Sequence, residues 1–255
     1  MTDPRQLNYT PERAEQYLGY YRQAAAVADR SLSIMLEAFD LEDTTVLMVS
    51  DHGMAPIHSY VYVNTLLEQA GLLTLDSQNA VVLNQTKAFA IASGGAVHIY
   101  VNLVGREKGG GTVTAEEYPA IQGQIIEIFT NVVDPQTGVP VFQRVLPRSA
   151  LGALGLDHPN AGDVFAQAVP GYHLDAWRGN DFVFAQAEFY GQHGYDSSLP
   201  EMQTIFIASG TGISTPGTVL PPVRVLDYAP TIAWLLSFEP AGTIDGKVIP
   251  YFLQP

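Results

Sequence analysis

The sequence contains no cysteine. This absence excludes disulfide bonds, iron–sulfur clusters, thiolate zinc sites and a cysteine nucleophile. It leaves the redox compartment open.

Basic residues are also scarce. Twelve Lys and Arg stand against 26 Asp and Glu, which gives a formal net charge of −14. A field of this sign repels phosphate backbones and anionic lipid headgroups. We therefore expect no nucleic acid as an electrostatic partner.

Long apolar runs are missing as well. The sequence has no run of about 18 apolar residues, the length that a membrane-spanning helix requires. Residues 1–10 lack the apolar centre of a signal peptide. We expect no membrane segment within these residues, and the sequence itself indicates no compartment.

The remaining composition is that of a folded globular protein. Apolar residues make up 47% of the chain and charged residues 15%. At roughly 150 residues per domain, 255 residues predict one large domain or two small ones.

An α/β pattern begins near the N-terminus. Thr10, Pro11 and Glu12 combine a hydroxyl cap, an early proline and an early acid, which predicts a helix start. Apolar residues then recur at helical spacing, and we expect this stripe to pack on a sheet. The stripe consists of Tyr17, Tyr21, Ala24, Ala28, Leu32, Met35 and Phe39. Residues 45–49 follow as an unbroken apolar run, typical of a strand buried on both faces.

The alternation of helices and strands continues to the C-terminus. We expect strands at 97–103, 163–169, 182–187 and 204–208, helices at 114–129 and 226–236, and a short helix then a strand within 61–75. Together they predict a three-layer α/β/α sandwich with a mostly parallel central sheet. We expect the segment at about 134–192 to form a small β-rich insertion near the candidate functional site.

The sharpest local feature follows the first predicted strand, where Asp51 and His52 stand side by side. Ligands in open α/β sheets bind at the carboxyl ends of strands. A carboxylate next to an imidazole suits zinc, or manganese where more oxygens join, and Gly53 lets the backbone turn sharply. The alternative is a turn with a capping Asp and a structural His.

A second feature is the segment 191–196, in which His193 stands between two glycines. The flanking glycines let the chain bend there and direct the imidazole ring toward a ligand. The alternative is that His193 is an ordinary surface residue of a loop. Tyr195 and Asp196 are candidates to order the loop around a metal ligand. A plain turn explains Asp196 equally well.

Four segments in order carry a family resemblance: VSDHGM, HGYDSSLPEMQTIFIASGTGI, VLDYAPTIAWLL and IDGKVI. Together they resemble the type I phosphodiesterase/nucleotide pyrophosphatase branch of the alkaline phosphatase superfamily. The resemblance implies hydrolysis of small-molecule phosphoesters with two divalent metal ions, usually zinc, and a hydroxyl nucleophile. It further implies that Asp51 and His52 bind one metal ion and His193 the other.

The chain also departs from the family pattern. Members carry a first metal-binding Asp, a Thr or Ser nucleophile and an Asp with a nearby His before the long helix, and none of these can be placed here. Asp3 has no following His at short spacing. Thr2 is better explained as part of the N-terminal tail and Thr10 as a helix cap than either is as a nucleophile. We therefore expect residues 1–255 to form one alkaline-phosphatase-like domain that lacks its N-terminal part, has incomplete metal sites and is nearly inactive alone. The partner that we expect for this chain is a separate N-terminal portion of the protein.

Three further histidines are weaker candidates for substrate binding: His58, His158 and His173. His58 reads as a loop residue near His52, and the other two fall between the ligand motifs. For His58, a solvated loop position is the alternative.

Other functions remain open at this point. They are hydrolysis of phosphonates or sulfate esters, a phosphomutase, and a non-catalytic binding or assembly domain that retains the fold. Family members are often exported or membrane-attached, which allows an external location by analogy alone.

Overall fold

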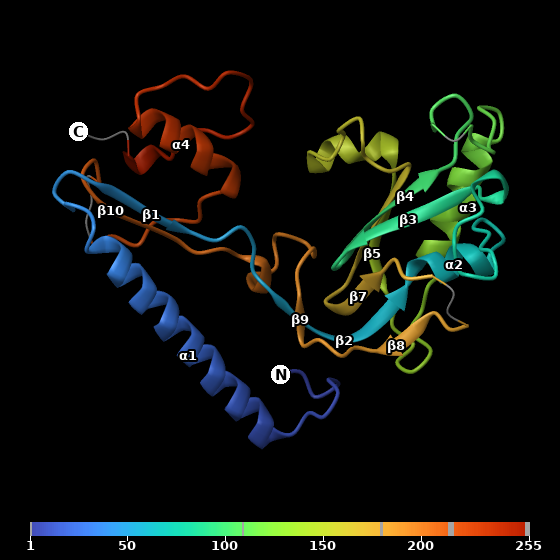
Figure 1. The fold of residues 1–255 in the computed structure, drawn as a ribbon, viewed down its shortest axis with the longest axis horizontal. Coiled ribbons are helices and arrows are strands. Elements are labelled where there is room, and N and C mark those ends of the chain that lie inside the picture. Colours follow the sequence, from blue (N-terminus) through green and yellow to red (C-terminus); the bar gives the residue numbers. More distant parts are fainter. Residues whose placement is uncertain (1, 109, 179–180, 214–216, 253–255) are drawn as a thin grey trace. The chain divides into compact units, whose positions relative to one another are not determined.

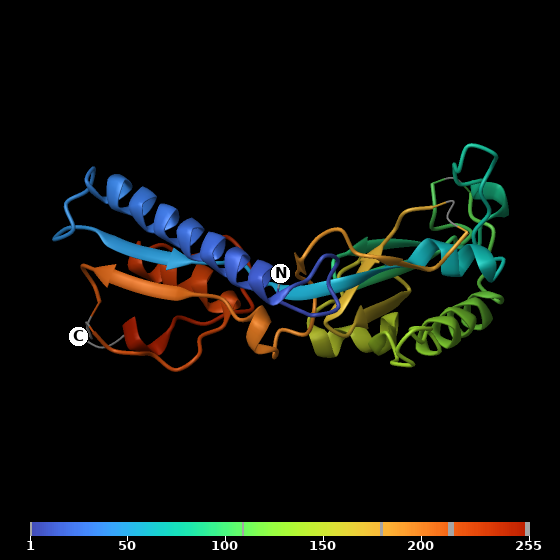
Figure 2. The same ribbon diagram turned by 90° about the horizontal axis from the view of Figure 1, so that it is seen from below.

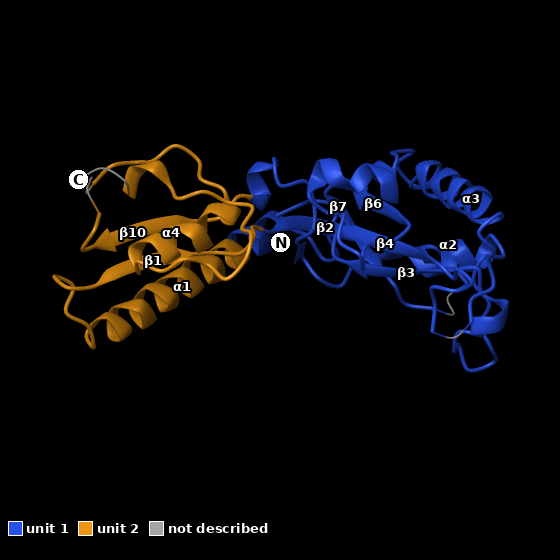
Figure 3. Cartoon of the chain, turned by 90° about the horizontal axis from the view of Figure 1, so that it is seen from above, with its two compact units in different colours: residues 1–15, 54–202 blue, residues 16–53, 203–255 orange. Residues whose placement is uncertain are grey.

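The computed structural model describes residues 2–108, 110–178, 181–213 and 217–252. The chain is a mixed α/β protein that forms two compact units, coloured separately in Figure 3. Unit 1 comprises residues 1–15 and 54–202, and unit 2 comprises residues 16–53 and 203–255.

Unit 1 contains two sheets. In the first, of order β7-β2-β8, β2 pairs parallel with β7 and antiparallel with β8 and β9. The second has the order β3-β4-β6-β5 and is antiparallel throughout (Figure 1). The strands are β2 (Ala55–Tyr62), β3 (Ala88–Ser93), β4 (Ala96–Val101), β5 (Phe142–Pro147), β6 (Val164–Ala168), β7 (Gly171–Asp175), β8 (Phe184–Gln186) and β9 (Gly191–Gln192). The helices are α2 (Val63–Gln69) and α3 (Tyr118–Thr130), with 3-10 turns η1 (Leu83–Gln85), η2 (Arg148–Leu154) and η3 (Pro200–Met202).

Helix α3 shows how the sequence pattern becomes structure. Ile121, Ile125 and Phe129 recur every four residues and are its buried face. Ahead of the helix, Thr114 N donates to the Glu117 carboxylate at 2.9 Å, and Glu117 N donates to Thr114 Oγ1 at 3.3 Å. These two bonds close a turn at 114–117, and the helix begins after it at Tyr118, four residues later than predicted.

A buried ion pair fastens α3 to the second sheet. The Asp163 side chain is fully buried and pairs with the Arg106 guanidinium at 2.7 and 2.8 Å. The same carboxylate accepts hydrogen bonds from Val101 N at 2.6 Å and Tyr118 Oη at 2.9 Å. Although burial opposes ionisation, these donors hold the pKa of Asp163 below its usual value.

Unit 2 is a helix–sheet–helix arrangement. The strands β1 (Thr45–Val49) and β10 (Phe206–Gly210) pair antiparallel, and in the described part of the chain each pairs only with the other. Helix α1 (Pro11–Leu36) runs along one side of this pair and α4 (Tyr228–Leu235) along the other (Figures 1 and 2). The 3-10 turns η4 (Val225–Asp227) and η5 (Pro250–Phe252) complete the unit.

The two faces of the β1–β10 pair differ in burial. On the α4 side, Leu47, Phe206 and Ala208 pack against a small core of Tyr228, Ile249 and Phe252. On the α1 side, Ile205 and Ile207 remain exposed.

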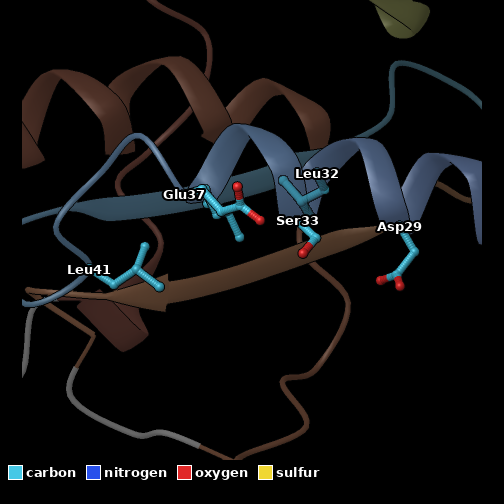
Figure 4. A pocket seen from close by; sticks show the side chains of 6 residues that line it. Asp29, Leu32, Ser33, Glu37 and Leu41 are labelled. Carbon is cyan, nitrogen blue, oxygen red and sulfur yellow. The ribbon is translucent and has the colours of Figure 1, made fainter.

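Helix α1 begins at Pro11 as predicted, but its apolar stripe is not packed. None of its 26 residues is buried. Tyr21 is 73% exposed and Met35 57%. An open hollow of about 410 Å³ lies beside the helix (Figure 4), and its lining residues are Asp29, Leu32, Ser33, Leu36, Glu37 and Leu41. The expectation that this stripe is buried on a sheet is therefore wrong for this chain.

Three details of the predicted fold also need correction. The expected mostly parallel sheet is not seen among the described residues, where β2 and β7 form the one parallel strand pair. A physical reason is the tight Gly94–Gly95 turn, which joins β3 to β4 and permits only antiparallel pairing. The strand expected at the end of 61–75 is reduced to an isolated bridge from Leu75 to Val81, and β2 was not predicted.

The segment at 134–192 contributes β5 to β9. Three of these strands, β7, β8 and β9, pair with β2, and β6 pairs with β4, so the segment is built into the sheets of unit 1. No described helix has the length and apolarity needed to span a bilayer.

Replacing Asp163 by Ala should lower the free energy of unfolding by about 3 kcal/mol, because the Arg106 charge and the Val101 amide lose their buried partner. Urea denaturation of both proteins measures this change. Asp43→Ala, at an exposed position, is the matched control and should change stability by less than about 0.5 kcal/mol. Equal effects of the two substitutions would show that the ion pair contributes nothing.

Candidate functional site

Asp51 and His52 lie directly after β1 in unit 2. Two hydrogen bonds fix the end of the strand: Ser50 N donates to Ile205 O at 3.3 Å, and Ile205 N donates to Ser50 Oγ at 3.0 Å. The chain therefore leaves the sheet at a defined point, and the next two side chains are presented to solvent. The Asp51 side chain is 86% exposed and that of His52 40%.

The local bonds orient the two side chains toward each other. His52 Nδ1 lies 2.8 Å from Gly53 O, and because a carbonyl oxygen only accepts, Nδ1 carries the proton. The other ring nitrogen, Nε2, lies 3.6 Å from Asp51 Oδ2. A carboxylate oxygen and an imidazole nitrogen thus converge, as a metal ligand pair requires.

His193 lies in unit 1, in the loop that follows β9. Its main-chain N donates to Gln192 Oε1 at 3.0 Å, and its carbonyl accepts from Gly95 N at 2.8 Å. The next residues anchor the loop. Tyr195 is buried and donates to Tyr172 O at 2.9 Å, and Asp196 pairs with Arg144.

His173 lies in β7, close enough to His193 for the two to interact electrostatically. Gln192 connects them: its Oε1 accepts from His193 N, so its Nε2 faces His173 Nδ1 at 3.2 Å and donates to it. The His173 ring also packs edge-on against Tyr60, with ring centres 5.3 Å apart. Burial lowers the pKa of His173 and His193 lowers it further, against the opposing effect of Asp175. Burial thus disfavours the protonated ring.

The other two candidates lie elsewhere in unit 1. His58 is 4% exposed within β2, so its interpretation as a loop residue is wrong. The register of β2 shifts between Ile57 and Ser59, and this irregularity places both Ile57 and His58 in the interior. His158 lies on an exposed turn, where its Nδ1 accepts from Asn160 N at 3.1 Å.

His58 has an unusual environment for a histidine. Its Nδ1 lies 2.8 Å from Ser59 Oγ, and its ring packs edge-on against Tyr172 at 5.0 Å. Its buried Nε2 has no hydrogen-bond partner among the described residues. Burial lowers the pKa of His58 and Arg5 lowers it further, whereas Asp3 and Asp134 act in the opposite direction.

The donor count limits what the site can hold. Within the part of the chain that the structure describes, no group of three or more His, Cys, Asp or Glu side chains could hold a metal ion. Asp51 and His52 form a pair in unit 2, and His193 with His173 belongs to unit 1. The donor types suit zinc, but their number in each unit falls short of the three protein ligands of a catalytic zinc ion.

Sequence reasoning missed Gln192, which connects the two histidines. Its position next to His193 was the available signal, but nothing in the sequence shows that its amide bridges to β7. The contacts of Tyr195 and Asp196, in contrast, agree with the loop-ordering interpretation.

Comparisons with known proteins place these features in context. The family model described as type I phosphodiesterase / nucleotide pyrophosphatase matches residues 2–196. Human ectonucleotide pyrophosphatase/phosphodiesterase 5 is similar in structure with a TM-score of 0.55 and 18% identity, over 94% of this chain and 52% of that one. The murine protein of the same name gives a TM-score of 0.52 and 16% identity, over 86% of this chain and 48% of that one. None of the curated protein sequences is significantly similar to the chain.

The structural likeness confirms the predicted α/β fold class, similar to the alkaline-phosphatase-like fold of those proteins. The chain spans about half the length of both structural relatives.

Because the folded state holds His58 neutral, stability should depend on pH in a defined direction. The pKa of His58 is lowered from about 6.5, so below that value the unfolded chain binds more protons and stability falls. The free energy of unfolding should therefore rise with pH up to about 6.5 and then level off. Denaturant titrations between pH 5 and 8 measure the slope.

His58→Gln should reduce this slope without removing it, because burial also lowers the pKa of His98 and His173. Gln136→Ala, at an exposed residue that does not titrate, is the control and should leave the slope unchanged. A slope that is the same in all three proteins would contradict the assignment to His58.

Proposed function

Because the chain belongs to the type I phosphodiesterase/nucleotide pyrophosphatase family, we propose that it is part of a hydrolase acting on small-molecule phosphoesters, with Asp51, His52 and His193 as its share of a metal centre. The observation that carries this proposal is the convergence of His52 Nε2 and the Asp51 carboxylate at the end of β1. Solvent-exposed ligands at a strand end are suited to a small-molecule substrate.

The donors present do not complete such a centre. The family resemblance implies two divalent ions, zinc in most members, and each catalytic zinc ion takes three protein ligands and an open position. The described residues offer pairs at most. We therefore derive no reaction step through a metal ion in this chain, and we propose that it is inactive or nearly so by itself.

The remaining ligands and the hydroxyl nucleophile are proposed to come from further polypeptide, in the same protein or in a separate chain. Two observations support this. The structural relatives contain about as much chain again outside the matched part. Unit 2 also has a surface suited to more polypeptide, because α1 has no buried residue and β1 pairs, in the described chain, with β10 alone.

A non-catalytic binding or assembly domain is the second candidate. The absence of a three-donor group among the described residues and the exposed stripe of α1 favour it. Retention of the convergent Asp51–His52 pair favours the hydrolase, since an exposed metal ligand pair serves no packing role.

Metal content and hydrolysis of a chromogenic phosphodiester test the proposal. They should be measured on this chain and on a form extended upstream to the length of its structural relatives. We expect bound metal and turnover only in the extended form. There, Asp51→Asn and His193→Ala should each lower kcat/KM by roughly 100-fold or more, because each removes a ligand.

Asp43→Ala is the control and should retain activity, because Asp43 is exposed and is not a candidate for the site. An extended form that folds but stays metal-free and inactive would overturn the hydrolase assignment and favour the binding domain. Full activity in the Asp51 and His193 variants would instead remove those residues from the site.

The surface of α1 provides a separate test of the added polypeptide. In this chain, Tyr21→Gln and Met35→Gln should change the free energy of unfolding by less than about 0.5 kcal/mol, because both side chains are largely exposed. In the extended form, each should cost about 1–3 kcal/mol if the face is covered. Urea denaturation gives both values.

Ile125→Ala, in the buried face of α3, is the positive control and should cost about 2–5 kcal/mol in both forms. Equal, negligible effects of the α1 substitutions in both forms would show that the added polypeptide does not cover this helix.

A further inference from the structure

The turn between β3 and β4 lies against the loop that carries His193. Gly94 and Gly95 form this turn, and Gly95 N donates to His193 O at 2.8 Å. The contact is between main chains, so it fixes the position of the His193 backbone rather than that of a flexible side chain.

Both turn residues must be glycine for the loop to approach this closely. A Cβ on Gly94 would lie 2.3 Å from His193 O and 3.1 Å from His193 C, and φ of Gly94 is +64°. A Cβ on Gly95 would lie 2.4 Å from Tyr195 Cδ1. Since real Cβ atoms do not come this close to other atoms, any side chain here would displace the loop.

The turn is itself held by two neighbouring strands. Ala168 N, in β6, donates to Gly95 O at 2.8 Å, and Leu174 N, in β7, donates to Gly94 O at 2.8 Å. The fit is reciprocal, because a Cβ on Gly194 would lie 2.6 Å from Ser93 O. The loop therefore packs against a turn that is hydrogen-bonded to both β6 and β7.

A second set of contacts fixes the far side of the loop. Gln167 Nε2 donates to Gly194 O at 3.2 Å, and the Asp196 carboxylate pairs with Arg144 on β5. Gln192 then connects the His193 main chain to the ring of His173. Backbone and neighbours thus constrain His193 from several elements at once.

From this packing we infer that Gly94 and Gly95 are positioning residues for His193. The two-glycine turn fixes the His193 main chain and thereby the position of its imidazole ring. This inference rests on the proposed function, which assigns His193 to a metal centre. It adds to that proposal the element that pre-organises the ligand before any metal or substrate binds.

Gly94→Ala in this chain tests the inference, with Gly123→Ala as the matched control, because a Cβ on Gly123 in α3 would meet nothing within 4 Å. Two readouts are measured by NMR at one fixed pH: solvent exchange of the Gly95 amide, and the ring C–H signals of His193 and His173. The ring of His98, whose Nδ1 accepts from Gly162 N at 3.1 Å, reports on the β3–β4 hairpin itself.

In Gly94→Ala we expect the Gly95 amide to exchange roughly tenfold faster, since its hydrogen bond is lost. The His193 and His173 signals should move, and those of His98 should not. Gly123→Ala should resemble the unmodified chain in every readout. Unchanged His193 signals in Gly94→Ala would overturn the inference, as would an equal movement of His98, which would mean that the turn only folds the hairpin.

If Gly94→Ala does not fold, Gly95→Ala decides by the same criteria, because its conflict is with the Tyr195 ring and not with backbone atoms. None of these readouts depends on metal or turnover. A failure of the hydrolase proposal would therefore appear in the activity assays alone, and a failure of the positioning inference would appear here alone.

Discussion

Burial of apolar side chains is the constraint on which the rest of this structure depends, and it is concentrated in unit 1. Among the largest fully buried side chains in the described chain, Ile249 alone belongs to unit 2. The two sheets of unit 1 share one core, and the loop that carries His193 rests on it through the buried Tyr195. Asp51 and His52, in contrast, follow a strand of a two-stranded sheet, which is marginally stable in isolation. The candidate residues of the two units therefore differ in the amount of buried core beneath them.

The sequence pattern predicted those features that depend on local chemistry. The start of α1 at Pro11 and the strand at 45–49 depend on local patterns, and the structure confirms both positions. The expectation that this strand is buried on both faces is wrong, because none of its residues is fully buried. The sequence pattern did not predict β2, because a register shift beside His58 breaks the alternation that identifies a strand. Nor could it predict that the stripe of α1 is exposed, because helical periodicity shows which face is apolar and not what covers that face.

The same distinction applies to the candidate site. Residue type and order picked out Asp51, His52 and His193, and the structure shows that the first two converge. Gln192 contacts His173, and the His193 loop contacts Gly94 and Gly95. These contacts join residues about 20 to 100 positions apart in the sequence, so no local pattern contains them. Glycine is common in hairpin turns for conformational reasons alone. The observation that favours a positioning role is that a Cβ on Gly94 would lie 2.3 Å from His193 O.

Among the described residues, the number of candidate metal donors, rather than their chemistry, separates each unit from a complete zinc site. His52 Nδ1 lies beside Gly53 O and its Nε2 lies beside the Asp51 carboxylate, and burial lowers the pKa of His173. These arrangements do not supply a third donor. The incomplete set of candidate donors and the exposed face of α1 agree with our proposal that this chain is one part of a larger centre.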